Sequence, residues 1–213
     1  RSLSSAASDV YKRQILKTDL SLFNNIVGWE FKENFLTVTS EFGEINIHYV
    51  DENQDSNEIA LLMHGNPTWG YLYRNMINPL KENGYRVIVP DLPGFGKSDK
   101  FAIRYNYTYE GFVDWMSQFV EGLDLKNITL FCQDWGGLIG LRLATKYFDR
   151  FDKIITANTG LPTGKYSFYC QVWARSKALN NYSRAIRKEP EVTVDLKPMQ
   201  SHKSLKELAN SFL

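Results

Sequence analysis

The stretch LFCQDWGGLIG, residues 130–140, ends an apolar run in an aspartate, an indole and two glycines. Residues 132–136 follow the pattern small–x–nucleophile–x–small, with Asp134 at the centre. Small residues on both sides permit a sharp strand-to-helix turn that projects the central side chain beyond the end of the strand. A carboxylate in that place could be a nucleophile, or it could only cap the following helix. The motif taken alone favours the cap, so the choice depends on the other motifs.

A second motif, HGNPTW at residues 64–69, follows another apolar run. The backbone N–H of Asn66, just after the HG turn, is suited to one half of an oxyanion-type hole. The N–H of Trp135, the residue after the candidate nucleophile, would supply the other half. His64 is a poor general base on this interpretation, and we expect it to orient the loop by hydrogen bonding.

A third motif, PDLPGFGKSDK at residues 90–100, is rich in glycine but is not a phosphate-binding loop. The P-loop spacing G-x-x-x-x-G-K-[ST] fails because Asp91 stands where the first glycine is required. The sequence instead predicts a structural loop that braces the turn at Asp134.

The elements that must position these motifs alternate along the chain. The sequence predicts a hairpin over 35–52 that breaks at Phe42–Gly43, and then buried strands that alternate with helices. The strands are expected at 59–65, 87–89, 127–133 and 152–158, and the helices at 70–84, 107–125 with Thr108 as N-cap, and 136–147. This order predicts an α/β fold with a mainly parallel, doubly wound sheet. Ligands bind at the carboxyl edge of such sheets, where Asp134 would lie. After residue 160 only helical stretches, at 169–179 and 205–212, are indicated.

Composition excludes several classes of partner. The chain has 213 residues and a net charge of +1 from 25 basic and 24 acidic residues, so neither nucleic acid nor a membrane surface is expected as main partner. No apolar run is long enough to span a membrane. Two cysteines give no disulfide framework, which favours the cytoplasm. We expect no metal and no cofactor. Aromatic residues, at 14%, suit a core or an apolar ligand pocket.

The segments HGNPTWGYLYRNMI, PDLPGFGKSDK, YTYEGFVDWM, LDLKNITLFCQDWGGLIGLRLA and ANTGLPTG occur in this order. Together they resemble the α/β-hydrolase fold and, within it, the haloalkane dehalogenases, from about Ile15 to about Gly164. Epoxide hydrolases share the Asp-Trp-Gly-Gly segment but usually have His before the Asp, where this chain has Gln133. The resemblance implies hydrolytic dehalogenation through a covalent alkyl ester on Asp134. The substrate would be a small, apolar halogenated compound.

The same resemblance implies a halide site. Trp135 is expected to be one halide ligand, because an indole N–H is a donor without acceptor character. The second ligand is Trp173, in the cap-helix subgroup of the family, or Asn66. Core packing of a helix is the alternative explanation for Trp173.

Hydrolysis of the ester requires a His and an acid partner, which the family takes from loops after later strands. His48, His64 and His202 are the only histidines. None is a credible base, so we expect the base and its acid to be absent from this chain, which would be C-terminally incomplete and alkylate itself at most once. Alternatives are an epoxide hydrolase, for which cap tyrosines 166, 169 and 182 are available, and a non-catalytic binding protein.

Three segments are expected. Residues 1–14 would be a disordered or artefactual leader, residues 15–160 an incomplete α/β-hydrolase core, and residues 161–213 a partial or divergent helical cap. Oligomeric state and substrate range are not predicted.

Overall fold

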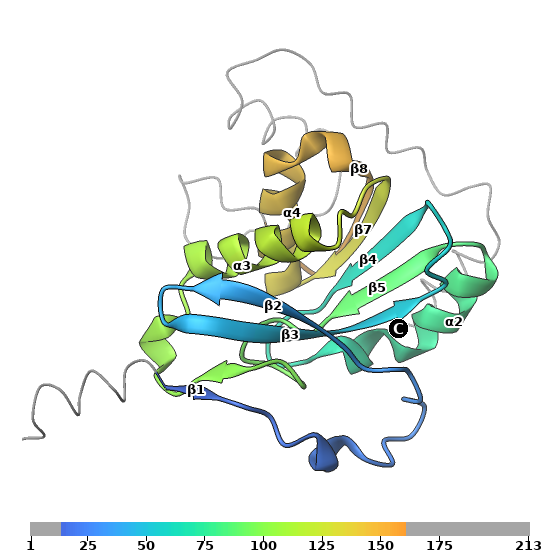
Figure 1. The fold of residues 1–213 in the computed structure, drawn as a ribbon. Coiled ribbons are helices and arrows are strands. Elements are labelled where there is room, and N and C mark those ends of the chain that lie inside the picture. Colours follow the sequence, from blue (N-terminus) through green and yellow to red (C-terminus); the bar gives the residue numbers. More distant parts are fainter. Residues whose placement is uncertain (1–13, 161–213) are drawn as a thin grey trace, which may run out of the picture.

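A computed structural model describes residues 14–160, which contain a six-stranded sheet in the order β2-β3-β5-β4-β7-β8 (Figure 1). Its strands are β2 (Asn34–Ser40), β3 (Gly43–Glu52), β4 (Ile59–Met63), β5 (Arg86–Pro90), β7 (Ile128–Gln133) and β8 (Phe151–Ala157). The pairings among β5, β4, β7 and β8 are parallel, whereas those of β2 with β3 and of β3 with β5 are antiparallel. The predicted parallel sheet with an N-terminal hairpin is confirmed.

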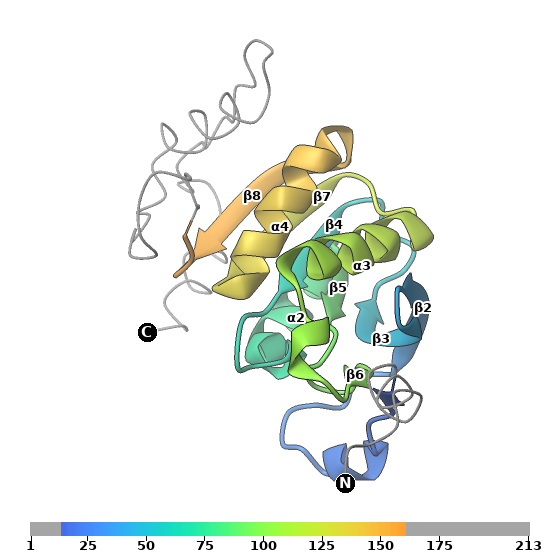
Figure 2. The same cartoon turned by 90° about the vertical axis from the view of Figure 1, so that its left-hand side faces the viewer.

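Helices cover both faces of the sheet, because the buried strands are apolar on both sides. Within β4, Ile59, Leu61 and Met63 pack in the cluster that includes α3 (Tyr109–Gly122) and α4 (Trp135–Lys146). The alternate residues, Ala60 and Leu62, pack with α2 (Arg74–Glu82). Figures 1 and 2 show α3 and α4 on one face and α2 on the other. The doubly wound arrangement is therefore confirmed.

The helix predicted over 70–84 begins differently. Residues Gly70–Tyr73 form a 3₁₀ turn, η2, and the α-helix starts only at Arg74. The Gly70 N–H donates to the buried Asp91 carboxylate at 2.8 Å, which fixes the approach of the chain to the sheet. The helix α3 begins as predicted, since the Thr108 hydroxyl accepts the Gly111 N–H at 3.0 Å.

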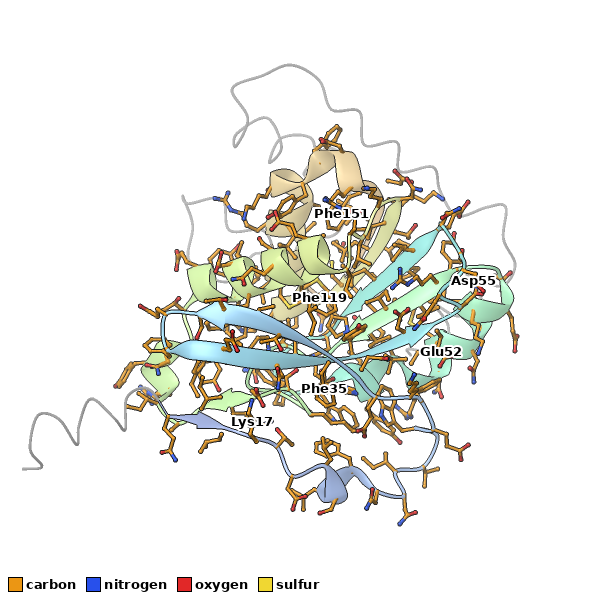
Figure 3. All side chains as sticks on the ribbon, viewed as in Figure 1. Lys17, Phe35, Glu52, Asp55, Phe119 and Phe151 are labelled. Atoms are coloured by element: carbon orange, nitrogen blue, oxygen red, sulfur yellow. The ribbon has the colours of Figure 1, made fainter. Side chains whose placement is uncertain are left out.

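Short elements escaped prediction because they are too short to show a period. Strands β1 (Ile15–Leu16) and β6 (Lys100–Phe101) form a separate antiparallel pair near Lys17, which Figure 3 labels. Three further 3₁₀ turns are η1 (Leu20–Phe23), η3 (Arg104–Asn106) and η4 (Phe148–Arg150). The core is aromatic between α3 and the sheet, where the fully buried Phe119 meets Tyr49 edge-on (Figure 3).

The predicted leader, apart from Gln14, and the predicted cap segment 161–213, with helices expected at 169–179 and 205–212, lie outside the described residues. Within residues 14–160, no helix is both long and apolar enough to cross a membrane.

Candidate active site

The HG turn and Asp134 meet because β4 and β7 are parallel neighbours. Met63 and Cys132 are in register, so the two strands end together at the carboxyl edge of the sheet. The backbone N–H of Asn66 donates to Asp134 Oδ1 at 2.8 Å. Two motifs that are 68 residues apart in the sequence thus converge on one carboxylate.

The backbone turns sharply at Asp134. Its φ of 51° and ψ of −123° lie in a region where residues other than glycine are rarely found. Such backbone conformations cost free energy and persist only where the surrounding structure enforces them. Neighbouring glycines make room for the turn. A Cβ at Gly65 would overlap the Asp134 side chain, and one at Gly136 would overlap the Met63 and His64 carbonyl oxygens. The glycines that the motif contains are therefore required by close packing.

Asp134 occupies the N-cap position of α4, but its side chain makes no capping hydrogen bond to the helix. Oδ1 is held by Asn66, while Oδ2 receives no hydrogen bond from residues 14–160. The carboxylate is only partly buried and lies at the positive end of the helix dipole, which favours negative charge. Asp134 therefore stands at the N-cap position, but its side chain does not form the hydrogen bond that a capping residue makes.

Trp135 opens α4, so its backbone N–H has no acceptor within the helix. Its ring is half-buried and lies 6.3 Å from the ring of Phe112. Across residues 14–160, no acceptor binds its indole N–H, and the exposed Asn66 side chain likewise has no partner. Trp135 and Asn66, two of the candidate halide ligands, therefore lie beside Asp134, and within the described part of the chain their side-chain N–H groups bind no acceptor. Trp173 lies outside the described residues.

His64 is completely buried and uses both ring nitrogens for the loops. Nδ1 donates to the Gly65 carbonyl and Nε2 accepts the Leu92 N–H, each at 2.9 Å. Burial lowers the pKa of His64, although the charge of Asp91 and the Gly65 bond act in the opposite direction. The prediction that His64 orients the loop is confirmed. The 90–100 loop is hydrogen-bonded to the 64–70 segment through Leu92 and Asp91, so it supports the HG turn, whereas its bracing of the turn at Asp134 stays a prediction.

A buried aspartate–histidine pair was missed by the sequence analysis. The Asp91 carboxylate accepts from His48 Nδ1 at 2.9 Å and from the N–H groups of Gly70 and Lys97, each at 2.8 Å. Burial raises the pKa of Asp91, but the hydrogen bond and charge of His48, the charge of His64 and the Lys97 N–H together outweigh it and hold that pKa below its ordinary value. The signal that could have found this residue is its position directly after a strand, as with Asp134.

Two further contacts come from the end of β8, the neighbour of β7. The Asp134 N–H donates to the Asn158 carbonyl at 3.2 Å, and the Thr159 hydroxyl donates to the Asp134 carbonyl at 2.7 Å. These residues belong to the segment ANTG, to which the sequence analysis gave no individual role.

The family model for the alpha/beta hydrolase fold matches residues 61–179. The chain belongs to the α/β-hydrolase fold family. Among curated members of this fold, a haloalkane dehalogenase of Psychrobacter cryohalolentis is 52% identical over 154 residues, which cover 72% of this chain and 51% of that protein. The chain thus spans about half the length of the curated relatives it matches.

Solved structures of α/β hydrolases are also similar to this chain. A tetrameric haloalkane dehalogenase from Paraglaciecola agarilytica has a TM-score of 0.66 and 39% identity, covering 68% of this chain and 49% of its own. An epoxide hydrolase mutant from Vigna radiata has a TM-score of 0.51 and 27% identity, covering 59% of this chain and 38% of its own. The similarity to haloalkane dehalogenases is greater in both sequence and structure.

Proposed function

We propose that this protein acts as a haloalkane dehalogenase and that Asp134 is its nucleophile, at the centre of a nucleophile elbow. The observation that carries the proposal is the unequal hydrogen bonding of the Asp134 carboxylate. Asn66 N–H holds Oδ1 and leaves Oδ2 without a described partner. The similarity to haloalkane dehalogenases of two bacteria, at 52% and 44% identity, supports the same assignment.

The first step is a displacement at a saturated carbon. Asp134 Oδ2 forms a C–O bond with the carbon that bears the halogen, and the carbon–halogen bond breaks with its electron pair leaving on the halide. A carboxylate is ionised at neutral pH, so the step needs no base. Oδ1 becomes the carbonyl oxygen of the ester, still bonded to the Asn66 N–H. The step as written uses neither a metal nor an organic cofactor.

The departing halide needs donors that carry no competing lone pair. Indole N–H groups meet that condition, so we propose Trp135 as one ligand, with Trp173 or the Asn66 amide as the second. The preferred partner is a small, apolar halogenated molecule together with its halide product. The buried, free Cys132 thiol suits a reducing compartment, and we infer the cytoplasm.

Ester hydrolysis is the second step: a water oxygen bonds to the ester carbonyl carbon, the bond from that carbon to Oδ2 breaks, and the alcohol leaves with one water proton while the other passes to solvent and the carboxylate is restored. Before that bond breaks, an oxyanion develops on Oδ1. We propose that the N–H groups of Asn66 and Trp135 stabilise it. Within residues 14–160, His48 is buried and hydrogen-bonded to Asp91, and His64 is buried and hydrogen-bonded to Leu92. We therefore propose neither histidine as the base that activates the water.

The experiment is intact-mass measurement of the full chain after incubation with 1-bromobutane, together with bromide release. We expect bromide in solution and, in quenched samples, a butyl group on the residue-134 peptide. Asp134→Ala should abolish both signals. Asp152→Ala, which removes an exposed carboxylate of β8, should leave both unchanged. Labelling that persists in Asp134→Ala would contradict the proposal.

An epoxide hydrolase remains the second candidate, since the solved epoxide hydrolase from Vigna radiata shares this fold. An assay of diol formation from 1,2-epoxyhexane distinguishes the two. We expect bromide release to exceed diol formation, and the reverse order would favour the second candidate.

A further inference from the structure

Thr159 bonds to the peptide unit that joins the candidate nucleophile to its helix. Its hydroxyl donates to the Asp134 carbonyl oxygen at 2.7 Å, which also accepts the N–H groups of Gly137 at 3.0 Å and Leu138 at 3.3 Å. The preceding residue, Asn158, accepts the Asp134 N–H through its carbonyl at 3.2 Å. The dipeptide after β8 therefore binds both backbone polar groups of Asp134, from a strand distant in sequence.

The Thr159 side chain is held in place by packing. A Cβ on Gly137 would overlap the Thr159 hydroxyl, Cβ and methyl, so the side chain fills the space that this glycine leaves beside α4. A β-branched side chain has few accessible χ1 rotamers, and packing on one side restricts it further. The hydroxyl is thus presented to the Asp134 carbonyl in a fixed direction.

The peptide held by Thr159 has a second end. The Asp134 C=O and the Trp135 N–H belong to one planar, trans peptide unit, in which the two groups point in opposite directions. A bond that fixes the carbonyl therefore fixes the N–H, and accepting a hydrogen bond at the oxygen polarises the amide toward a stronger donor. The same bond restrains ψ of Asp134, whose value of −123° sets where the carboxylate lies relative to α4.

We propose that Thr159 is a positioning residue for Asp134: its hydroxyl fixes the 134–135 peptide, and thereby the attack direction of the carboxylate and the direction of the Trp135 N–H. This inference rests on the proposed function. Thr159 acts through the backbone of Asp134 and is not expected to touch the substrate. Its hydroxyl, rather than its bulk, is the part that acts.

The test compares the first-order rate of alkylation in the full chain and its variants, at saturating 1-bromobutane. Thr159→Val keeps the branched shape and removes the hydroxyl, and we expect the rate to fall about tenfold with the half-saturating concentration of 1-bromobutane unchanged. Thr159→Ser keeps the hydroxyl, and we expect it to stay close to the parent rate. Melting temperatures of both variants are measured in parallel.

A purely structural role predicts a different pattern, in which melting temperature falls while the rate per folded molecule is unchanged. Should Thr159→Val not fold, Thr159→Ser and Thr159→Ala, which differ only in the hydroxyl, give the same comparison. A variant without the hydroxyl that alkylates as fast as the parent overturns the role of Thr159 alone. A parent chain that takes up no butyl group and releases no bromide overturns the proposed function, and this inference with it.

Discussion

Two aspartates follow strands on either side of β4, and they differ in almost every other respect. Asp91 comes after β5 and Asp134 after β7, and both of these strands pair with β4. The Asp91 carboxylate is completely buried and receives three hydrogen bonds. The Asp134 carboxylate is partly exposed, receives one described hydrogen bond, and is attached to backbone at positive φ.

The difference separates a carboxylate saturated with hydrogen bonds from the one that we propose as nucleophile. Each donor bound to a carboxylate stabilises its charge and lowers its reactivity, so the saturated Asp91 is suited to hold loops together. It fixes the start of η2 and the turn at Lys97, and through them the 64–70 segment. Asp134 retains an oxygen available for bond formation, at the cost of a strained backbone.

The largest expected effect separates the two by stability. We expect Asp91→Ala to lower the free energy of unfolding by about 3–5 kcal/mol, because it leaves His48 and two backbone N–H groups buried without an acceptor. Asp134→Ala should change the free energy of unfolding by less than about 1 kcal/mol, because the hydrogen bond that it removes, from the Asn66 N–H, is exposed to solvent. Urea denaturation measures both. Equal losses in the two variants would remove the distinction.

The second effect tests how closely the HG turn approaches Asp134, the proposed nucleophile. In Gly65→Ala the new methyl would overlap the Asp134 side chain, and we expect alkylation to slow about a hundredfold as the carboxylate is displaced. Gly122→Ala, at the last residue of α3, whose Cβ would meet only the flexible Leu36 side chain at 3.1 Å or more, is the control for a glycine substitution away from Asp134. An unchanged rate in Gly65→Ala would show that the contact is not needed for reactivity.

The third effect is the pH dependence of the free energy of unfolding that arises from the buried His64. Burial keeps the pKa of His64 below its ordinary value of 6.5 in the folded protein, so the unfolded chain binds a proton first as the pH falls. Its contribution to stability is therefore complete above that pH and is lost on acidification through it, by at most about 1.4 kcal/mol per pH unit. His64→Gln should flatten the fall in unfolding free energy between pH 7 and pH 5. Parallel curves for parent and variant would contradict this.

The smallest effect concerns the end of β4. The buried Tyr73 hydroxyl donates to the Met63 carbonyl at 2.8 Å, and Tyr73→Phe should cost about 1–2 kcal/mol by leaving that carbonyl without this donor. Alkylation should stay within about threefold of the parent, because the strand is also held by its sheet neighbours. A melting curve and the intact-mass assay measure the two. A larger loss of alkylation would show that Tyr73 helps to position Asp134 and does not only stabilise the fold.

The local elements could be read from the sequence because their periods are local. Apolar runs indicated the four mutually parallel strands β4, β5, β7 and β8, and Thr108 identified the start of α3. The glycines around Asp134 pointed to a sharp turn, although the atoms that leave no room for a side chain there, such as the Met63 and His64 carbonyl oxygens beside Gly136, come from a distant part of the sequence. Strands β1 and β6 were not predicted, because two residues carry no periodicity and their pairing joins segments far apart in the sequence.

The sequence by itself predicted the candidate nucleophile, Asp134, and the order in which strands and helices follow one another along the chain. Only the tertiary structure decided which oxygen of Asp134 is held, that Asp91 is paired with His48, and that Thr159 bonds to the Asp134 carbonyl. Each of those contacts joins residues at least 25 positions apart. Sheet register and side-chain packing set such contacts, and no local pattern of residues records them.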